Sequence, residues 1–262
     1  MSAWARPFIA AVAALGRWGP AAGVRLTKYT GKSAEFVHPK HLVDAPWHHW
    51  YLEHLRPTDT VLDVGCANGA HTLTAARHAR RVVGLDRDLR HLRIAAASAR
   101  RLELRNIRLF ARDVTAPFPF RDASFDAVLF LDVIEHLEPR VAVVREIRRV
   151  LKPEGRLLVS APNRDTAWRR RLGEAGLFAF SDPDHKVEYT HEEFLAELTA
   201  GGFAPVGPVM PIVYDTPWAG LIDVVGGLSL GLYARLVRWK RNAALQHPEE
   251  STGFRVVARR CA

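Results

Sequence analysis

The chain of 262 residues contains only two cysteines, Cys66 and Cys261. They lie far apart and belong to no recognisable metal-ligand spacing, which argues against a disulfide framework or a zinc knuckle and favours a reducing cytoplasm. Acidic residues are also scarce, with 28 Asp and Glu against 37 Lys and Arg, giving a formal net charge of +9. This excess favours anionic partners, whether nucleic acid, anionic lipid or an acidic metabolite, without selecting among them.

Two glycine-rich phosphate-binding patterns are missing as well. Counted from Gly65, the second and third glycines of a G-x-G-x-x-G pattern are replaced by Ala67 and Ala70. A Cβ at Ala67 would crowd a pyrophosphate, so the turn suits NAD or FAD poorly. No G-x-x-x-x-G-K-[ST] loop occurs either. The chain therefore lacks the features of a dinucleotide-binding or P-loop protein.

No hydrophobic run is long enough to span a bilayer. Residues 218–233 are apolar over some sixteen positions, short of the ~20 that a spanning helix needs. Basic residues follow at 235, 238, 240 and 241. We interpret the segment as a lid over an apolar substrate pocket or as an interfacial element with its basic end on anionic headgroups. Residues 1–16 resemble a short secretory signal, but their positive region is thin and we expect an amphipathic or docking helix there.

The most informative segment that is present runs from residue 60 to 69 and continues at 82–86. An apolar run predicts a buried parallel strand, Gly65 and Gly69 predict a tight turn, and the second run predicts another strand that ends in Asp86. Strand, turn, helix and strand in this order form a nucleoside-binding crevice at the carboxyl edge of an α/β sheet. The turn suits a ligand without phosphates, and the acid is placed to bind a ribose.

Residues 61–69 resemble the first motif of the class I S-adenosylmethionine-dependent methyltransferases, and more narrowly the methyltransferase type 11 and quinone-biosynthesis-like group. They depart from the usual pattern only at Ala67. The resemblance continues in register over residues 57–165, through the acids Asp86 and Asp113 to the segment 124–137. It implies a doubly wound α/β fold with a seven-stranded, mostly parallel sheet whose last strand is antiparallel.

The resemblance also implies S-adenosyl-L-methionine as the cofactor and assigns roles to individual residues. Asp86 would bind both ribose hydroxyls, Asp113 would accept from the adenine amino group, and the next backbone N–H, at Val114, would serve a ring nitrogen. The implied cofactor-binding residues are Asp63, Gly65, Cys66, Asn68, Gly69, Asp86, Arg87, Asp113, Val114 and Asp132.

Structural roles compete with some of these assignments. Asp63 is as well suited to tying down the amides of the glycine turn as to touching the cofactor. Asp86 could instead cap the helix that follows it, because a helical pattern begins at Asp88. Cys66 is better interpreted as a small packing residue than as a nucleophile.

Two histidines are candidates for catalysis. Methyl transfer from a sulfonium needs alignment of the nucleophile and exclusion of water, and a hydroxyl acceptor also profits from a general base. His136 follows the fourth expected strand by a few residues, and His185 lies in a loop beyond the fifth. His136 could instead order its loop, and His185 could belong to an ordinary solvated loop. Acids flank His136, but no closed ligand set is visible, so we predict no metal.

We expect two parts of the chain: a helical cap over residues 1–56, with a helix running to Leu55, and a methyltransferase domain over 57–262. The domain would carry the lid or interfacial insertion at 215–250. Thr190 and Glu193 form a capping box that opens a helix. Residues 203–213 and 253–258 are expected as the last two strands, an antiparallel pair at one sheet edge.

The sequence thus predicts a cytoplasmic methyltransferase that acts on a small, apolar or amphipathic molecule, with O-methylation by in-line transfer as the leading hypothesis. Peripheral membrane contact through 218–241 stays open. One alternative is RNA methylation, which the positive charge suggests, although no [DN]-P-P-[YFW] motif occurs. Another is a non-catalytic, cofactor-binding or membrane-associated scaffold.

Overall fold

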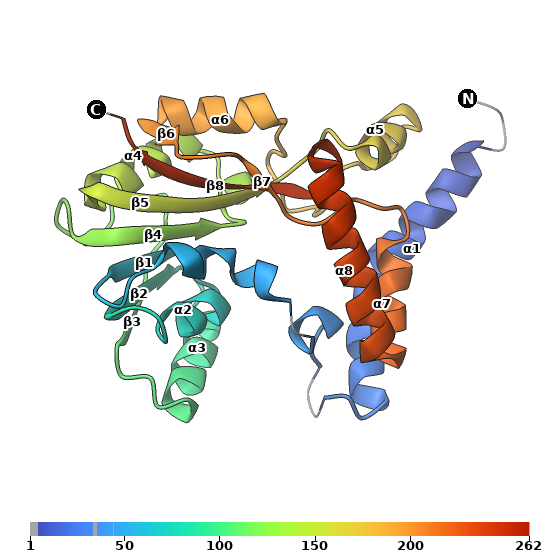
Figure 1. Ribbon diagram of the computed structural model, residues 1–262, viewed down its shortest axis with the longest axis horizontal. Coiled ribbons are helices and arrows are strands. Elements are labelled where there is room, and N and C mark those ends of the chain that lie inside the picture. The colour runs from blue at the N-terminus through green and yellow to red at the C-terminus, as the bar shows by residue number, and fades with distance from the viewer. Residues whose placement is uncertain (1–4, 34–35, 44, 262) are drawn as a thin grey trace. The chain divides into compact units, whose positions relative to one another are not determined.

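A computed structural model describes residues 5–33, 36–43 and 45–261. The chain divides into two compact units, each of which can be followed in Figure 1. The sheet unit comprises His49–Pro162, Asp182–Met210 and Phe254–Ala262, and the helical unit comprises Met1–His48, Asn163–Ser181 and Pro211–Gly253. Most of the expected cap (1–56) and insertion (215–250) thus falls into one unit, although the division into domains at residue 57 stays a prediction.

The sheet has eight strands in the order β3-β2-β1-β4-β5-β8-β6, with β7 paired to β8. Strands β1 to β5 pair in parallel, whereas β6 is antiparallel to β8. The expected doubly wound, mostly parallel sheet with an antiparallel end is therefore confirmed. Its strands are β1 Thr60–Val64, β2 Arg81–Asp86, β3 Ile107–Ala111, β4 Phe125–Leu131, β5 Leu151–Pro162, β6 Phe203–Pro205, β7 Met210–Pro211 and β8 Gly253–Arg260.

Helices cover both faces of this sheet, as the alternation of its buried side chains requires. The helical elements around it are η2 Pro46–His54, α2 Ala70–Ala75, α3 Leu89–Arg101, η3 Ile134–His136, α4 Arg140–Val150 and α6 His191–Ala200. Leu62, Val83 and Val128 share one buried cluster with residues of α4 and α6. Their chain neighbours Val61, Val82 and Ala127 share another with η2 and α2. Both faces of the sheet are therefore core, which fixes the register of its strands.

Two sequence-based expectations about this unit were wrong in detail. The helix expected to run to Leu55 is the 3₁₀ element η2, interrupted at His49, whose φ of −108° and ψ of 31° are not helical. The strand expected at 203–213 is split into β6 and β7, with Gly207 between them at a φ of +86° that strands do not use. The capping box of Thr190 and Glu193 is confirmed at the start of α6.

The helical unit is built around the contact between α1 and α7. A Cβ placed on Gly19 of α1 would lie 2.2 Å from Gly220 of α7, so the two backbones touch where both residues lack a side chain. None of the described helices is both long and apolar enough to cross a bilayer. The helical elements of this unit are α1 Ala5–Tyr29, η1 Pro39–His41, α5 Ala167–Glu174, α7 Ala219–Leu228, α8 Leu230–Gln246 and η4 Pro248–Glu250.

Candidate active site

The turn after β1 is a tight, Cβ-free cradle. Gly65 and Gly69 both have left-handed backbone conformations, with φ of +74° and +82°. A Cβ at Gly65 would lie 2.6 Å from the side chain of Val133, and one at Gly69 would lie 2.7 Å from that of Ala95. Both the conformation and the space therefore require glycine here. Asn68, which was also predicted to bind the cofactor, is exposed at the tip of the turn.

Asp86, at the end of β2, is hydrogen-bonded to this turn. One carboxylate oxygen accepts from the amide of Ala67 at 2.8 Å, and the other accepts from the amide of Asp88 at 2.8 Å. Each oxygen retains acceptor capacity, because a carboxylate oxygen has two lone pairs. Asp88, not Asp86, is the N-cap of α3, since its side chain accepts from the amide of Arg90. The alternative that Asp86 caps the following helix is therefore wrong.

Asp63 and Cys66 lie beneath the turn. Asp63 is buried, and its carboxylate accepts from the hydroxyl of Thr72 in α2 at 2.5 Å, so it supports the helix that follows the glycines. Burial raises the pKa of Asp63 to about 6, although the bond from Thr72 opposes this. Burial also raises the pKa of the Cys66 thiol, whose sulfur packs over Gly84 of β2. This environment suits a packing residue and not a nucleophile.

Asp113 follows β3, which lies beside β2 with Ala111 paired to Asp86. Asp113 is exposed, and one of its oxygens accepts from both the amide and the hydroxyl of Thr115 at 2.8 Å. These two bonds lower the pKa of Asp113, and the nearby charge of Arg87 adds to the effect. Val114 is half-buried against the core. The two predicted acids therefore stand at the same edge of the sheet.

Asp132 follows β4 in a strained conformation. Its φ of +54° is unusual for a residue with a side chain. Two bonds to Ser160 of β5 hold it: its amide donates to the Ser160 hydroxyl at 3.1 Å, and its carboxylate accepts from that hydroxyl at 2.8 Å. The chain thus changes direction at Asp132, at the carboxyl edge of the sheet between β4 and η3.

A buried carboxylate–histidine pair lies next to η3. Nδ1 of His185 is 2.7 Å from Oε1 of Glu188, whose side chain is fully buried. Nε2 of His185 is 3.9 Å from Oε1 of Glu135, which is also buried. Burial, followed by the charge of Asp132, raises the pKa of Glu135 well above its usual range. Two acids thus flank one imidazole in a site that water barely reaches.

The backbone brings the two predicted catalytic histidines together. The carbonyl of Glu135 accepts from the amides of Lys186 and Val187, at 2.7 and 3.3 Å, and so ties the 182–189 loop to η3. As a result the rings of His136 and His185 lie edge to face, with their centroids 4.7 Å apart. His136 is exposed and His185 is largely covered. Their proximity was not predictable from a separation of 49 positions.

The same three side chains form a potential metal site. Among the described residues, Glu135, His136 and His185 are the one group whose ligand atoms all lie within 4.8 Å of one another. Oε2 of Glu135 is buried and has no hydrogen-bond partner. A histidine pair with a carboxylate is chemically suited to a divalent transition metal. The expectation of no metal stays a prediction, because the geometry is equally suited to proton transfer.

The cradle fits S-adenosyl-L-methionine on structural grounds. The Gly65–Gly69 turn excludes a Cβ, and Asp86 combines two amide bonds with spare acceptor capacity beside it. The residues that would hold the cofactor are therefore those at the carboxyl ends of β1, β2, β3 and β4. Comparison with known proteins agrees: residues 62–159 match a family model described as a methyltransferase domain. Residues 62–159 therefore carry a methyltransferase domain, which is similar to that of S-adenosylmethionine-dependent methyltransferases.

Relatives and solved structures support this domain. The chain is 37% identical over 176 residues to a probable S-adenosylmethionine-dependent methyltransferase of Mycolicibacterium smegmatis, covering 60% of this chain and 66% of that protein. It is 38% identical over 136 residues to a demethylmenaquinone methyltransferase of Tropheryma whipplei, covering 50% and 55%. The chain thus spans less than two thirds of either relative. The crystal structure of the [4+2]-cyclase SpnF shares the fold, with a TM-score of 0.60 at 22% identity over 82% of this chain and 81% of that one.

Sequence reasoning about the methyltransferase domain passed over two residues of the site. Glu188 received no role, and Glu135 was considered only as a flanking acid. The spacing of His185 and Glu188 at i and i+3 was the available signal, since it lets the two side chains meet in a turn.

Proposed function

We propose that the protein transfers a methyl group from S-adenosyl-L-methionine to a hydroxyl of a small, apolar or amphipathic molecule. The observation that supports this most is the Glu188–His185 pair at the carboxyl edge of the methyltransferase domain. The name of the demethylmenaquinone methyltransferase relative is consistent with an apolar acceptor. The cofactor supplies an electrophilic methyl group on a sulfonium, so the protein need only bind, orient and remove a proton.

In this proposal Glu188 sets the tautomer of His185. A proton on Nδ1 is held by the Glu188 carboxylate at 2.7 Å, which leaves the lone pair on Nε2. Nε2 would take the proton of the acceptor hydroxyl, and the cofactor, held at the carboxyl ends of β1 to β4, would supply the methyl group to that oxygen and leave as a neutral thioether. The imidazolium that results is stabilised by the buried acid, and the proton then leaves to solvent through exposed His136.

The proposal is tested by methyl-donor turnover against lysate fractions separated into lipids, small polar metabolites and RNA. We expect turnover with a lipid or apolar fraction, and about a hundredfold lower kcat in His185→Ala and in Glu188→Gln. Binding of S-adenosyl-L-methionine, measured by isothermal titration, should be unchanged in both variants. His78→Ala, at an exposed histidine of the sheet unit away from η3, is the matched control.

Several outcomes would overturn parts of this proposal. Turnover on RNA alone would favour the RNA alternative, and an absence of binding heat up to millimolar cofactor would favour a non-catalytic scaffold. Undiminished kcat in both variants would remove general-base catalysis. Loss of turnover on adding EDTA, restored by a divalent ion, would assign Glu135, His136 and His185 to metal binding instead. A cytoplasmic location and the peripheral contact through 218–241 stay predictions.

A further inference from the structure

One side of α1 carries two large aromatic side chains that are mostly exposed among the described residues, although the ring of Tyr29 meets that of Phe36 edge-on. Trp18 is 75% exposed and Tyr29 is 76% exposed. Ala11, Trp18, Ala22 and Tyr29 are separated by seven, four and seven residues, which puts all four on one side of the helix. A helix stripe with two largely exposed aromatic rings favours an interaction surface.

The apolar residues of α7 extend this face. Gly19 contacts Gly220, and Thr30, directly after α1, donates to the carbonyl of Gly227 at 2.9 Å, so α1 and α7 run in the same direction. Successive residues of a helix are rotated by about 100° about its axis. In two parallel helices, the residue before the contact residue of one helix and the residue after the contact residue of the other therefore point to the same side of the pair.

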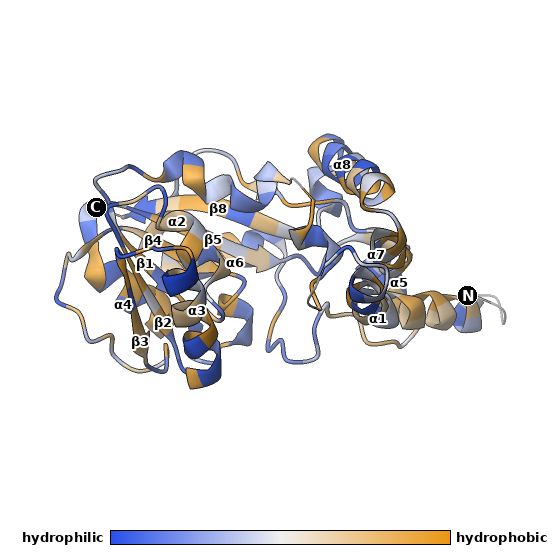
Figure 2. Ribbon diagram, turned by 90° about the horizontal axis from the view of Figure 1, so that it is seen from below, coloured by the Kyte–Doolittle hydropathy of each residue, from blue (hydrophilic) through white to orange (hydrophobic). Residues whose placement is uncertain are grey.

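Four exposed side chains meet this condition. Trp18 precedes Gly19 on α1, and Tyr29 precedes Thr30. Leu221 and Leu228 follow the two contact glycines of α7 and are 43% and 57% exposed. We call Trp18, Tyr29, Leu221 and Leu228 the apolar face. Figure 2 colours much of α1 and α7 towards the hydrophobic end of its scale.

The helices that carry and adjoin this face are basic. α1 contains Arg6, Arg17, Arg25 and Lys28 and no acidic residue. α8, which packs on α7, contains three arginines and one lysine and likewise no acidic residue. Asp223, the single acid of α7, faces inward to His38 and the hydroxyl of Tyr233. A partner of the apolar face therefore meets tryptophan, tyrosine and leucine together with the basic residues of α1.

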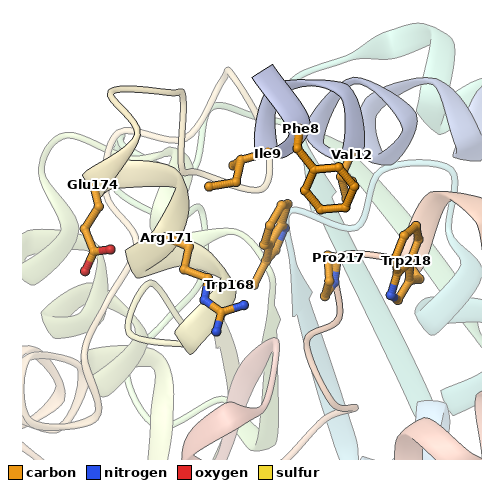
Figure 3. Close-up of a pocket in the computed structure, with 8 residues that line it drawn as sticks. All are labelled: Phe8, Ile9, Val12, Trp168, Arg171, Glu174, Pro217 and Trp218. Carbon is orange, nitrogen blue, oxygen red and sulfur yellow. The ribbon is translucent and has the colours of Figure 1, made fainter. Parts of the chain in front are cut away.

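An apolar groove lies at the N-terminal ends of the same two helices. Phe8, Trp168 and Trp218 line it together with Ile9, Val12 and Pro217, and its volume is about 460 Å³. The guanidinium of Arg171 lies beside Trp168 at its edge (Figure 3). Glu174 also lines the groove, so its charged residues are one cation and one anion. Its apolar wall suits an acyl chain.

We propose that the helical unit docks on an anionic phospholipid bilayer through the apolar face, with the groove accepting part of a lipid chain. Tryptophan and tyrosine prefer the headgroup level of a membrane, and nearby Arg and Lys gain from anionic lipid. The helices lie in the interface and do not cross it. A second copy of the chain would fit less well, because two such faces would bring their positive charges together. This docking is independent of the methyl-transfer reaction proposed above.

Vesicle sedimentation of the full chain tests the proposal. We expect binding to phosphatidylcholine vesicles with about one third phosphatidylglycerol, weakening as salt rises, and little binding to phosphatidylcholine alone. Replacing the apolar face by Trp18→Ser, Tyr29→Ser and Leu228→Ser together should reduce binding about tenfold or more. The reversal Arg25→Glu should also reduce it.

The matched controls lie on α3 of the sheet unit. Ile94→Ser removes an exposed aliphatic side chain, and Arg93→Glu reverses an exposed charge, and neither should change sedimentation. If the triple variant fails to fold, quenching of wild-type tryptophan fluorescence by brominated phosphatidylglycerol gives an independent readout. Absence of sedimentation, or equal loss in the α3 controls, would overturn the proposal. So would a dimer in the absence of lipid that Trp18→Ser dissociates, because a second copy would then cover this face.

Discussion

The sheet unit and the helical unit solve the problem of burying apolar residues differently. The sheet unit sandwiches its strands between helices, and its exposed large apolar residues among those described are few: Leu89, Ile94, Leu102, Phe110 and Val206. The helical unit exposes Phe8, Trp18, Tyr29, Phe36, Phe178, Trp218, Leu221, Leu228, Leu232, Trp239 and Leu245. A sheet that is covered on both faces buries its hydrophobic residues, whereas a few packed helices leave an outer face without a partner.

The polar residues differ in the same way. The sheet unit concentrates acids at one edge and buries several of them, including Asp63, Glu135 and Glu188. The helical unit carries basic residues on its helices and leaves most of them near the surface. The two distributions suit the two proposals: general-base chemistry at a protected site, and docking on an anionic lipid surface. The net charge of +9 is therefore an average over an acidic edge in the sheet unit and basic helices in the helical unit.

The substitution with the largest expected effect should destabilise the helical unit and leave the sheet unit unchanged. Gly220→Val would place a Cβ 2.2 Å from the carbonyl of Leu15, so α7 could not pack on α1 and the helical unit should lose about 3 kcal/mol or more. Hydrogen exchange followed by mass spectrometry should show lost protection in α1, α7 and α8 only. Gly231→Ala, whose Cβ would meet nothing within 4 Å, is the control. Equal loss of protection in the sheet strands would contradict two separable units.

A second substitution acts on the sheet unit alone. Gly65→Val adds a side chain at a φ of +74° and against Val133, so we expect cofactor affinity to fall about a hundredfold or more by isothermal titration. Gly207→Ala, at a φ of +86° with open space around it, should cost stability through the same backbone strain without changing affinity. Retained affinity in Gly65→Val would show that the turn does not hold the cofactor.

The buried acid Asp63 gives the sheet unit a pH dependence. Its pKa is raised by burial from 3.8 to about 6, so the folded state favours the protonated form. The resulting stability is complete below about pH 4 and is lost as pH rises through 6, by about 3 kcal/mol in total. Asp63→Asn should therefore gain free energy of unfolding relative to the wild type between pH 4 and 7, as measured by urea unfolding. A difference that does not vary with pH would contradict this origin.

The smallest expected effect on stability comes from an exposed residue of the helical unit. Trp18→Ser removes an exposed ring, so the free energy of unfolding should change by no more than about 0.5 kcal/mol. Phe130→Ser in the core of β4 should instead cost about 3 kcal/mol or more, because it empties a fully buried site. Thermal unfolding of both variants measures the pair. A large loss in Trp18→Ser would mean that its ring is packed in solution.

The order of the sheet motifs, the glycine turn, Asp86, Asp113 and the capping box of Thr190 and Glu193 could all be predicted from the sequence. Each depends on local conformation or on strand order, which short-range patterns encode. His136 and His185 could be named as candidates for the same reason, because each follows a recognisable strand or loop. The contact with Glu135 could not, since Glu135 reaches His185 only after the 182–189 loop is tied to η3, whereas Glu188 lies three residues from His185 in the same loop.

By itself, the sequence therefore determined the nucleoside crevice and the kind of donor that fits it. The tertiary structure alone decided that Glu135 meets His185, and that α1 and α7 run parallel with Trp18, Tyr29, Leu221 and Leu228 on one side. The physical reason is the range of the contacts. A turn or cap is specified by neighbours a few residues apart, whereas these contacts join segments that are adjacent only after the chain has folded.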